Sequence, residues 1–221
     1  MRIDILTLFP EMVEPFFQES IMKRAIQKGL VTVNIIDIRN FSTLKNKQVD
    51  DTPYGGGSGM VLMCEPVVSA IGSVKDQDSK VILMTPQGKM YHQKMAYELR
   101  NEKHLILVCG LYEGFDERIR NFVDMELSIG DFVVTGGELP AMVVADSVIR
   151  LIKGVITEES FLQDSFTEDL LDYETYTKPY EFRGMKVPDV LLSGDHKKID
   201  EFRQNSRYNR TKERRPDLLK K

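Results

Sequence analysis

The middle of the chain reads HLILVCGLYEG from His104 to Gly114. Its first six residues are mostly apolar, as in a strand that is buried on both faces, and Gly110 ends the run. The preceding Gln93–Glu102 stretch has the apolar spacing of a helix, and Val81–Met84 predicts another buried strand. Because strands that alternate with helices form parallel sheets, we expect an α/β fold around these two strands.

The same alternation extends toward both ends of the chain. The sequence predicts further strands at Ile3–Phe9, at Val31–Ile38 and around Val133-Val134. It predicts helices at Met12–Lys28, which Gly29 ends, and at Glu65–Val74, Asp116–Val123 and Leu139–Ile152. The Arg39–Met60 stretch between two of these elements is an aperiodic loop, and its length is typical of functional loops.

Three of the expected strands end in loops that contain glycine or proline. These loops are Thr85–Gly88, Cys109–Arg118 and Ser128–Pro140. Ligands of open α/β sheets bind outside the carboxyl ends of the strands, so we expect the loops to form one pocket. Neither the GxxxxGK[ST] nor the GxGxxG nucleotide motif occurs. Glycine backbone could instead bond an adenine edge, with Ile129, Val134 and Leu139 around the ring; the alternative is three ordinary strand-to-helix turns.

A second loop, Asp50–Met60, reads DDTPYGGGSGM. Its glycines and proline exclude a helix or strand interior and let the backbone approach a ligand closely. The two carboxylates and Tyr54 suit a flat, hydrogen-bonding nucleobase. A flexible surface turn is the alternative.

The composition is that of a globular protein, with 221 residues, 42% hydrophobic and 29% charged. This length fits one large domain, or one domain with a small module. Two cysteines, Cys64 and Cys109, indicate a reducing compartment, and the scattered histidines His92, His104 and His196 predict no metal site. The N-terminal stretch is too short and interrupted for a secretion signal or membrane span, so we expect a cytoplasmic protein without membrane contact.

The charge is unevenly distributed along the chain. The net charge is −4, yet the stretch from Arg203 to Lys221 has eight Lys and Arg against two Asp and Glu. A basic tail on an acidic body is what a localised phosphate-binding surface requires. A solvated tail without a partner is the alternative.

These segments, with Arg214–Leu219 at the C-terminus, resemble the bacterial tRNA (guanine-N1)-methyltransferase family, usually called TrmD. They follow the family's order and spacing over the whole chain. The resemblance implies an α/β fold, with a SPOUT-type trefoil-knotted methyltransferase domain, a mostly parallel sheet and a small C-terminal helical domain. It also implies methyl transfer from S-adenosylmethionine to N1 of the guanosine 3′-adjacent to the anticodon in tRNA.

The resemblance also suggests how the chain is divided. We expect a knotted methyltransferase domain at 1–160, a flexible interdomain linker at 161–175 and a basic helical tRNA-binding domain at 176–221. Two features of the sequence agree with this division, because Lys153–Pro179 has no helical period and Asp195–Arg203 has the pattern of a capped basic helix. The family further implies a homodimer whose active site lies at the subunit interface.

Individual roles follow from the resemblance, residue by residue. For the methyl donor it implies Met84, Thr85, Pro86, Gly110, Tyr112, Glu113, Ile129, Gly130, Asp131, Phe132, Val133, Val134, Gly136, Gly137 and Pro140. For the tRNA we expect Asp50, Asp51, Tyr54, Gly55, Gly56, Gly57, Arg203, Arg207, Arg210 and Arg214. The resemblance makes Asp164 the general base and Arg150 the cation that stabilises the transition state. The residues by themselves favour other interpretations, with Asp164 as a helix N-cap and Arg150 as a solvated or helix-terminal cation.

Two positions depart from the family pattern. Phe132 stands where tyrosine is common, and Asn46 where histidine is frequent, so this chain has no tyrosine hydroxyl at position 132 and no imidazole at position 46. Two rival functions are a methyltransferase for ribosomal RNA, which the Asp50–Gly59 loop argues against, and a non-catalytic tRNA-binding protein, which Asp164 and Arg150 argue against. The sequence assigns no Mg²⁺ site.

Overall fold

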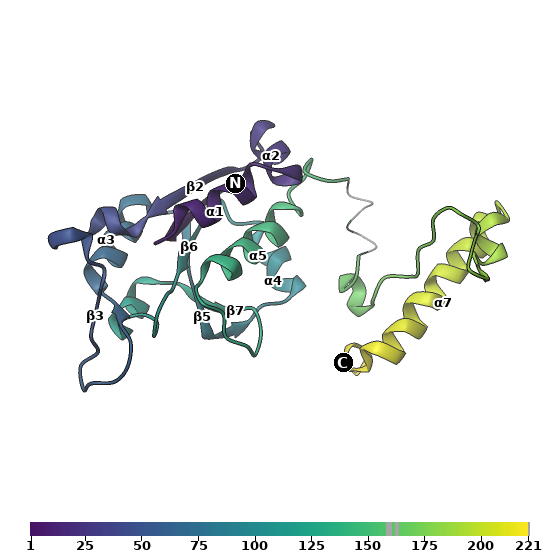
Figure 1. Cartoon of the computed structure of the whole chain (residues 1–221). Coiled ribbons are helices and arrows are strands. Elements are labelled where there is room, and N and C mark those ends of the chain that lie inside the picture. The colour runs from purple at the N-terminus through teal and green to yellow at the C-terminus, as the bar shows by residue number, and fades with distance from the viewer. Residues whose placement is uncertain (158–160, 162–163, 221) are drawn as a thin grey trace. The chain divides into compact units, whose positions relative to one another are not determined.

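The computed structural model describes residues 1–157, 161 and 164–220, which fall into two compact units, Met1–Ile156 and Thr157–Lys221 (Figure 1). Residue 160, where the first predicted domain ends, and Lys221, where the last one ends, lie outside the described residues. Each unit is described by itself below.

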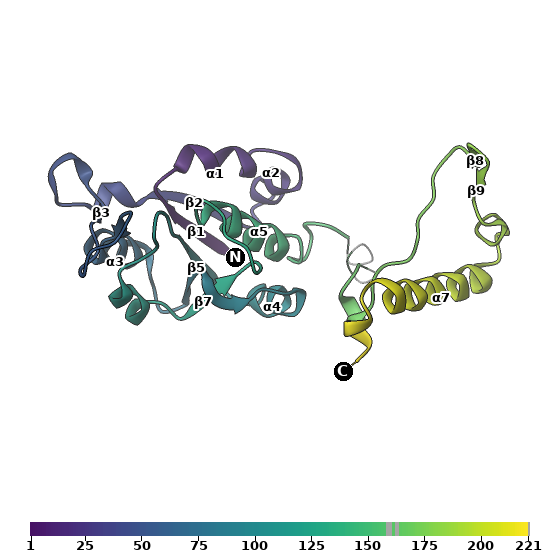
Figure 2. The same ribbon diagram turned by 60° about the horizontal axis from the view of Figure 1, so that its bottom comes forward.

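The first unit is built on a parallel sheet of five strands, in the order β2-β1-β6-β5-β7. Figure 2 labels β2, β1, β5 and β7 of this sheet. The strands are β1 (Arg2–Thr7), β2 (Thr32–Asp37), β5 (Ser79–Met90), β6 (His104–Cys109) and β7 (Met125–Ser128). Every neighbouring pair is parallel. The prediction of an α/β fold with a mostly parallel sheet is therefore confirmed.

Helices cover this sheet. They are α1 (Pro10–Phe17), α2 (Ser20–Gln27), α3 (Cys64–Val74), α4 (Gln93–Leu99) and α5 (Glu138–Ile149). Helix α5 packs on β1 and β6 and contacts α1, α2 and α4, whereas α3 packs on β1 and on the 3-10 helices η1 (Ile38–Phe41) and η3 (Glu117–Phe122). Ile106 and Val108, two residues apart on β6, join the buried side chains of α3 in one cluster. All six residues of β6 are buried, as the sequence predicts.

The predicted helix at Met12–Lys28 is wrong in one respect, because the structure has two helices there, α1 and α2. Helix α1 ends at Phe17, and Ser20 has a φ of 50°, which a continuous right-handed helix does not allow. Gly29 follows α2 with a φ of 67°, and the Leu30 N–H donates to the Ala25 carbonyl. Gly29 thus has the predicted capping conformation.

Two strand predictions are also wrong. Strand β5 continues to Met90, and Met84 and Lys89 both pair with Leu127, so that Thr85–Gly88 forms an irregularity within the strand rather than its end. No strand is found at Val133-Val134, and the edge strand is instead β7. Its four residues, MELS, are too few and too mixed to give a period in the sequence.

The long Arg39–Met60 stretch has more structure than a loop. It contains η2 (Lys45–Lys47) and the short strand β3 (Asp50–Asp51), which pairs antiparallel with β4 (Val61–Leu62). The glycine run therefore lies between two paired strands, and the predicted helix at Asp116–Val123 is the 3-10 helix η3.

The second unit is dominated by helix α7 (His196–Arg214), whose N-cap is Asp195, as predicted. Shorter elements precede and follow it. They are η4 (Thr167–Asp169), β8 (Glu181–Phe182), β9 (Met185–Lys186), η5 (Asp189–Leu192) and η6 (Pro216–Leu219).

The segment before the hairpin packs along α7. The Leu171 N–H donates to Thr211 Oγ1 over 2.8 Å, and the Glu174 carboxylate accepts from Ser206 Oγ over 2.6 Å. These contacts hold Leu171 and Glu174, near the C-terminal end of the predicted linker, against α7. Among the described residues, no helix is both long and apolar enough to cross a lipid bilayer.

Candidate functional site

The carboxyl ends of β6 and β7 and the irregular stretch within β5 surround a hollow of about 330 Å³ in the first unit. Three loops line it, and they are the three glycine- and proline-bearing loops that the sequence predicts at one pocket. The loops meet because β6, β5 and β7 are neighbours in the sheet and run in the same direction. The adjacency of the three loops is therefore observed.

Fourteen of the fifteen residues expected to hold the donor line this hollow. They are Met84, Thr85, Pro86, Gly110, Tyr112, Glu113, Ile129, Gly130, Phe132, Val133, Val134, Gly136, Gly137 and Pro140. Asp131 is exposed and is not part of the lining. That any of these residues binds a donor stays a prediction.

Two glycines let the loops touch backbone to backbone. The Gly137 N–H donates to the Gly110 carbonyl over 2.7 Å, and a Cβ on Gly137 would lie 2.6 Å from the Gly110 nitrogen. A Cβ on Gly110 would lie 2.6 Å from the Phe115 ring. A side chain at position 137 would displace backbone, and one at position 110 would displace the Phe115 ring, so the wall of the hollow depends on both glycines.

A buried carboxylate supports the same wall from below. Glu138 is 2% exposed at the start of α5, and its Oε1 accepts from Thr7 Oγ1 over 2.7 Å at the end of β1. Burial raises the pKa of the neighbouring Cys109 thiol, and the negative charge of Glu138 raises it further. The Cys109 thiol therefore stays protonated at neutral pH.

The sequence analysis missed part of the lining. The missed residues are Gln87, Leu111, Gly114, Phe115, Glu117, Arg120, Leu127, Ser128 and Thr135. Most adjoin a predicted residue in the same loop, which is the signal that could have found them. Arg120 has no such neighbour, because it comes from η3 and bonds Glu117, Glu126 and Gln87 across the rim.

The residues expected to bind a nucleobase do not line this hollow. Asp50 is half-buried, Asp51 accepts a hydrogen bond from the Thr52 N–H, and Tyr54 is fully exposed. Gly55, Gly56 and Gly57 have φ values of 89°, 80° and 134°. The run therefore has a conformation that side chains rarely adopt, as a glycine loop predicts.

The two residues expected to catalyse the reaction lie in different units. Arg150 is half-buried at the end of α5, one turn after Asp146, whose pKa is raised by burial and lowered in part by the Arg150 charge. Asp164 is half-buried in the second unit, and Phe166, not Asp164, occupies the cap position of η4. A cooperation between Arg150 and Asp164 stays a prediction.

The four arginines expected to bind phosphate differ in their surroundings. The Arg207 side chain is 4% exposed and pairs with Glu168 over 3.1 Å, while Arg203 lies over the Tyr173 ring, 4.9 Å from its centre. Arg210 is 3.8 Å from the Glu174 carboxylate, whereas Arg214 is exposed. Arg214 is therefore the most accessible of the four.

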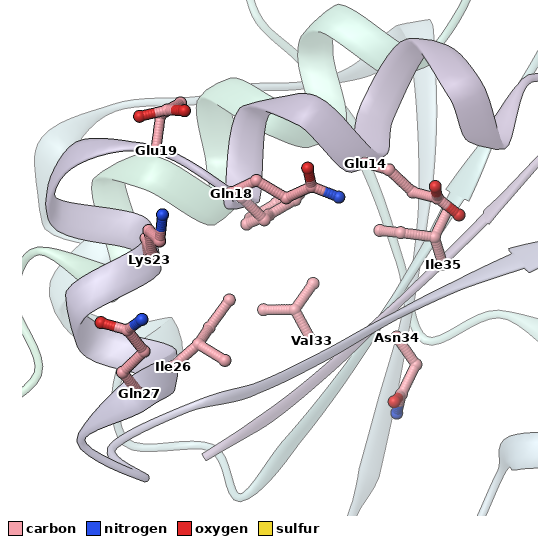
Figure 3. A pocket seen from close by; sticks show the side chains of 10 residues that line it. Glu14, Gln18, Glu19, Lys23, Ile26, Gln27, Val33, Asn34 and Ile35 are labelled. Atoms are coloured by element: carbon pink, nitrogen blue, oxygen red, sulfur yellow. The ribbon is translucent and has the colours of Figure 1, made fainter.

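A second hollow, of about 720 Å³, lies between α1, α2 and the edge strand β2 (Figure 3). Ile26 and Val33 point into it, and the ionisable groups of its lining are Glu14, Glu19 and Lys23. No glycine loop or strand end contributes to it. The smaller hollow is therefore the better candidate for a nucleotide-type ligand.

The described residues include no group of three or more His, Cys, Asp and Glu side chains that could hold a metal ion. Asn46, one of the two departures from the family pattern, is exposed with a φ of 58°. Phe132, the other departure, lines the hollow and is 56% exposed.

Comparisons with known proteins show what the chain is similar to. The family described as "tRNA (Guanine-1)-methyltransferase TrmD" matches residues 1–221. A protein of Malacoplasma penetrans is 53% identical over 99% of this chain and 97% of its own length, and one of Macrococcus caseolyticus is 55% identical over 99% and 92%. A third, from Mycoplasma capricolum, is 52% identical over 99% and 92%. All three relatives are named tRNA (guanine-N(1)-)-methyltransferase.

Proposed function

The chain belongs to the tRNA (guanine-1)-methyltransferase family, and from that membership we propose that it methylates N1 of the guanosine 3′-adjacent to the anticodon in tRNA. It is a methyltransferase, and the methyl donor is S-adenosylmethionine. One observation carries the proposal within the molecule, namely the hollow in which fourteen expected donor residues meet. We further propose that the enzyme acts in the cytoplasm.

The hollow suits a donor of this class. Its volume of about 330 Å³ lies in the range of small-molecule sites. Backbone groups of Gly110, Gly136 and Gly137 lie in its wall and can hydrogen-bond an adenine edge, while Ile129 and Val134 offer apolar contact to the ring. When bound, S-adenosylmethionine supplies an electrophilic methyl group on a positively charged sulfur.

The chain supplies proton transfer and charge stabilisation in this proposal. Guanine N1 carries a proton that must leave before its electron pair can bond the methyl carbon. The Asp164 carboxylate accepts that proton, and Arg150 stabilises the negative charge that develops on the guanine O6. The carbon–sulfur bond breaks as the nitrogen–carbon bond forms, so the donor leaves as a neutral thioether.

The tRNA is held in two ways in this proposal. Asp50, Asp51 and Tyr54 bind the guanine on the exposed β3–β4 loop, and the exposed Arg214 binds a backbone phosphate. The proposal includes a trefoil knot around the donor hollow. The backbone contact between Gly110 and Gly137, and the bridge between Leu111 and Gly136, support loops that cross at close range.

The site is shared between two subunits of a homodimer in this proposal. The first unit carries the donor hollow and the second carries Asp164, which is what a composite site requires. Asp164→Asn and Gly137→Trp homodimers should each be inactive. Mixed dimers should recover activity, because one of their two composite sites carries neither substitution. Background activity in verified heterodimers would exclude the shared site.

The activity is tested with purified protein, labelled S-adenosylmethionine and unmodified tRNA transcripts. We expect one methyl group per tRNA, and mass spectrometry should place it on the guanosine next to the anticodon. A transcript with adenosine at that position is the control and should accept none. Transfer to ribosomal RNA but not to tRNA, or binding of tRNA without transfer, would overturn the proposal.

A further inference from the structure

Gly59 lies at the end of the loop that we expect to hold the guanine, yet its nearest neighbour belongs to the donor hollow. A Cβ on Gly59 would lie 2.5 Å from Cγ and 2.7 Å from Oε1 of Glu113. Glu113 lines the hollow between Tyr112 and Gly114. The Glu113 side chain therefore occupies space that exists only because residue 59 has no side chain.

Backbone hydrogen bonds fix this contact from both sides. The Glu113 N–H donates to the Met60 carbonyl over 3.0 Å, and the Leu62 N–H donates to the Gly114 carbonyl over 2.9 Å. The Asp116 N–H donates to the Leu62 carbonyl over 2.9 Å and completes this strip of backbone hydrogen bonds between residues 60–62 and 113–116. Because Met60 directly follows Gly59, the two loops cannot separate without breaking these bonds.

The strip also reaches the carboxylates that we expect to hold the base. Leu62 and Val61 form β4, whose antiparallel partner β3 consists of Asp50 and Asp51. One continuous ladder therefore leads from these carboxylates through β4 to the wall of the donor hollow. Gly59 lies where the ladder meets the hollow.

We propose that Gly59 is a positioning residue for the methyl donor, because it leaves the space in which the side chain of Glu113, a residue that lines the hollow, is held. A negative carboxylate there attracts the positively charged groups of S-adenosylmethionine. This inference rests on the proposed function. It predicts that a substitution in the guanine loop weakens donor binding even without tRNA.

The chain offers a matched control for the test. Gly59 and Gly56 lie in the same loop with φ values of 82° and 80°, so alanine at either position meets the same backbone strain. A Cβ on Gly56 meets nothing within 4 Å, however. Gly29, outside the site, has a φ of 67° and equally open surroundings, and serves as a control for strain elsewhere.

The experiment measures the Kd for S-adenosylmethionine by calorimetry, without tRNA, together with the melting temperature. Gly59→Ala should raise the Kd about tenfold, as expected when a contact to a charged group is lost, while Gly56→Ala and Gly29→Ala stay within about twofold of wild type. Gly59→Ala and Gly56→Ala should lower the melting temperature equally, because Glu113 can turn aside as a flexible side chain.

A second pair of variants identifies the cause. Glu113→Ala should weaken donor binding by itself, and adding Gly59→Ala to it should weaken binding no further, since the displaced group is already absent. If Gly59→Ala does not fold, Gly59→Asn and Gly56→Asn replace the pair, because asparagine tolerates a positive φ.

The outcomes separate this inference from the proposed function. Equal donor affinity in the Gly59 and Gly56 variants overturns the inference alone, and so does an additive loss in the Glu113→Ala background. A wild-type protein that binds no S-adenosylmethionine overturns the proposed function as well.

Discussion

The sequence predicts two groups of ligand-binding residues. One group lies in the glycine- and proline-bearing loops of the first unit, and the other consists of the arginines of α7 in the second unit. The structure brings fourteen of the fifteen loop residues around one hollow. The four arginines differ in their exposure to solvent. The Arg207 residue as a whole is 3% exposed, whereas Arg214 is exposed. Glycine and proline determine where a backbone turns, whereas a run of charges does not say which of them pair inside the protein.

The largest expected effect tests whether the first unit binds the donor while the second unit supplies the general base. Asp164→Asn keeps the shape of the side chain but removes its basicity, so turnover should fall about 10²–10⁴-fold. The Kd for S-adenosylmethionine should stay at the wild-type value, because the donor hollow lies in the first unit. Single-turnover kinetics and calorimetry measure the two quantities, and near-normal turnover would remove Asp164 from its role.

The next effect tests the tight packing of the loops. Gly137→Ala places a Cβ 2.6 Å from the Gly110 nitrogen, and backbone on both sides must shift. We expect a loss of about 1–3 kcal/mol in the free energy of unfolding and at least a tenfold rise in the donor Kd. Gly114→Ala is the control for space, because its Cβ meets nothing within 4 Å, although its φ of 105° adds strain. Urea unfolding of both variants measures the loss of stability. Equal donor affinities in the Gly137→Ala and Gly114→Ala variants would contradict the prediction.

The arginines of α7 should separate into two classes. Arg207→Ala leaves the Thr167 carbonyl and Glu168 without their buried partner, and should lower the stability of the second unit by about 1–3 kcal/mol. Arg214→Ala should change stability by less than about 0.5 kcal/mol, since Arg214 is exposed.

Salt dependence distinguishes the two classes in binding. Removing one phosphate contact should reduce the slope of log affinity against log salt by about 0.7–0.9, and we expect this reduction for Arg214→Ala. Filter binding over a series of salt concentrations measures it, with thermal melting as the stability readout. An unchanged slope would make Arg214 a solvated charge only.

The smallest effect concerns the pH dependence of the first unit. Two hydrogen bonds from the Arg118 side chain hold the pKa of Asp116 well below its ordinary value. A lowered folded-state pKa means that the pair stabilises the protein above the unfolded-state pKa, near 4, and that this contribution is lost as pH falls below it.

Asp116→Asn should therefore make the stability of the protein fall less between pH 7 and pH 3.5 than it does in the wild type, and the difference should be small because Arg118 is exposed. Urea unfolding at pH 3.5 and pH 7 measures the change. An identical pH dependence in the variant and the wild type would show that the pair contributes nothing.

The sequence by itself determined the elements whose signals are local. The apolar run of β6 and the Gly29 and Asp195 caps appear where the residues predict them, because a strand buried on both faces and a helix end each depend on nearby residues. The three glycine- and proline-bearing loops could be assigned to one pocket because each follows a predicted strand and parallel strands end at the same edge of a sheet, although Thr85–Gly88 lies within β5.

Only the tertiary structure decided the features that depend on distant residues. Strand β7 exists because β5 offers it an edge, and β5 continues past Pro86 because Lys89 finds Leu127 as a second partner. Arg207 is buried because Glu168 and Thr167, about forty residues earlier in the chain, lie against α7. Gly59 meets Glu113 because backbone hydrogen bonds from Glu113 to Met60 and from Leu62 to Gly114 join two loops that no periodicity connects. Contacts of this kind form between residues that are distant in the sequence. They depend on how the whole fold packs, and no local sequence pattern predicts them.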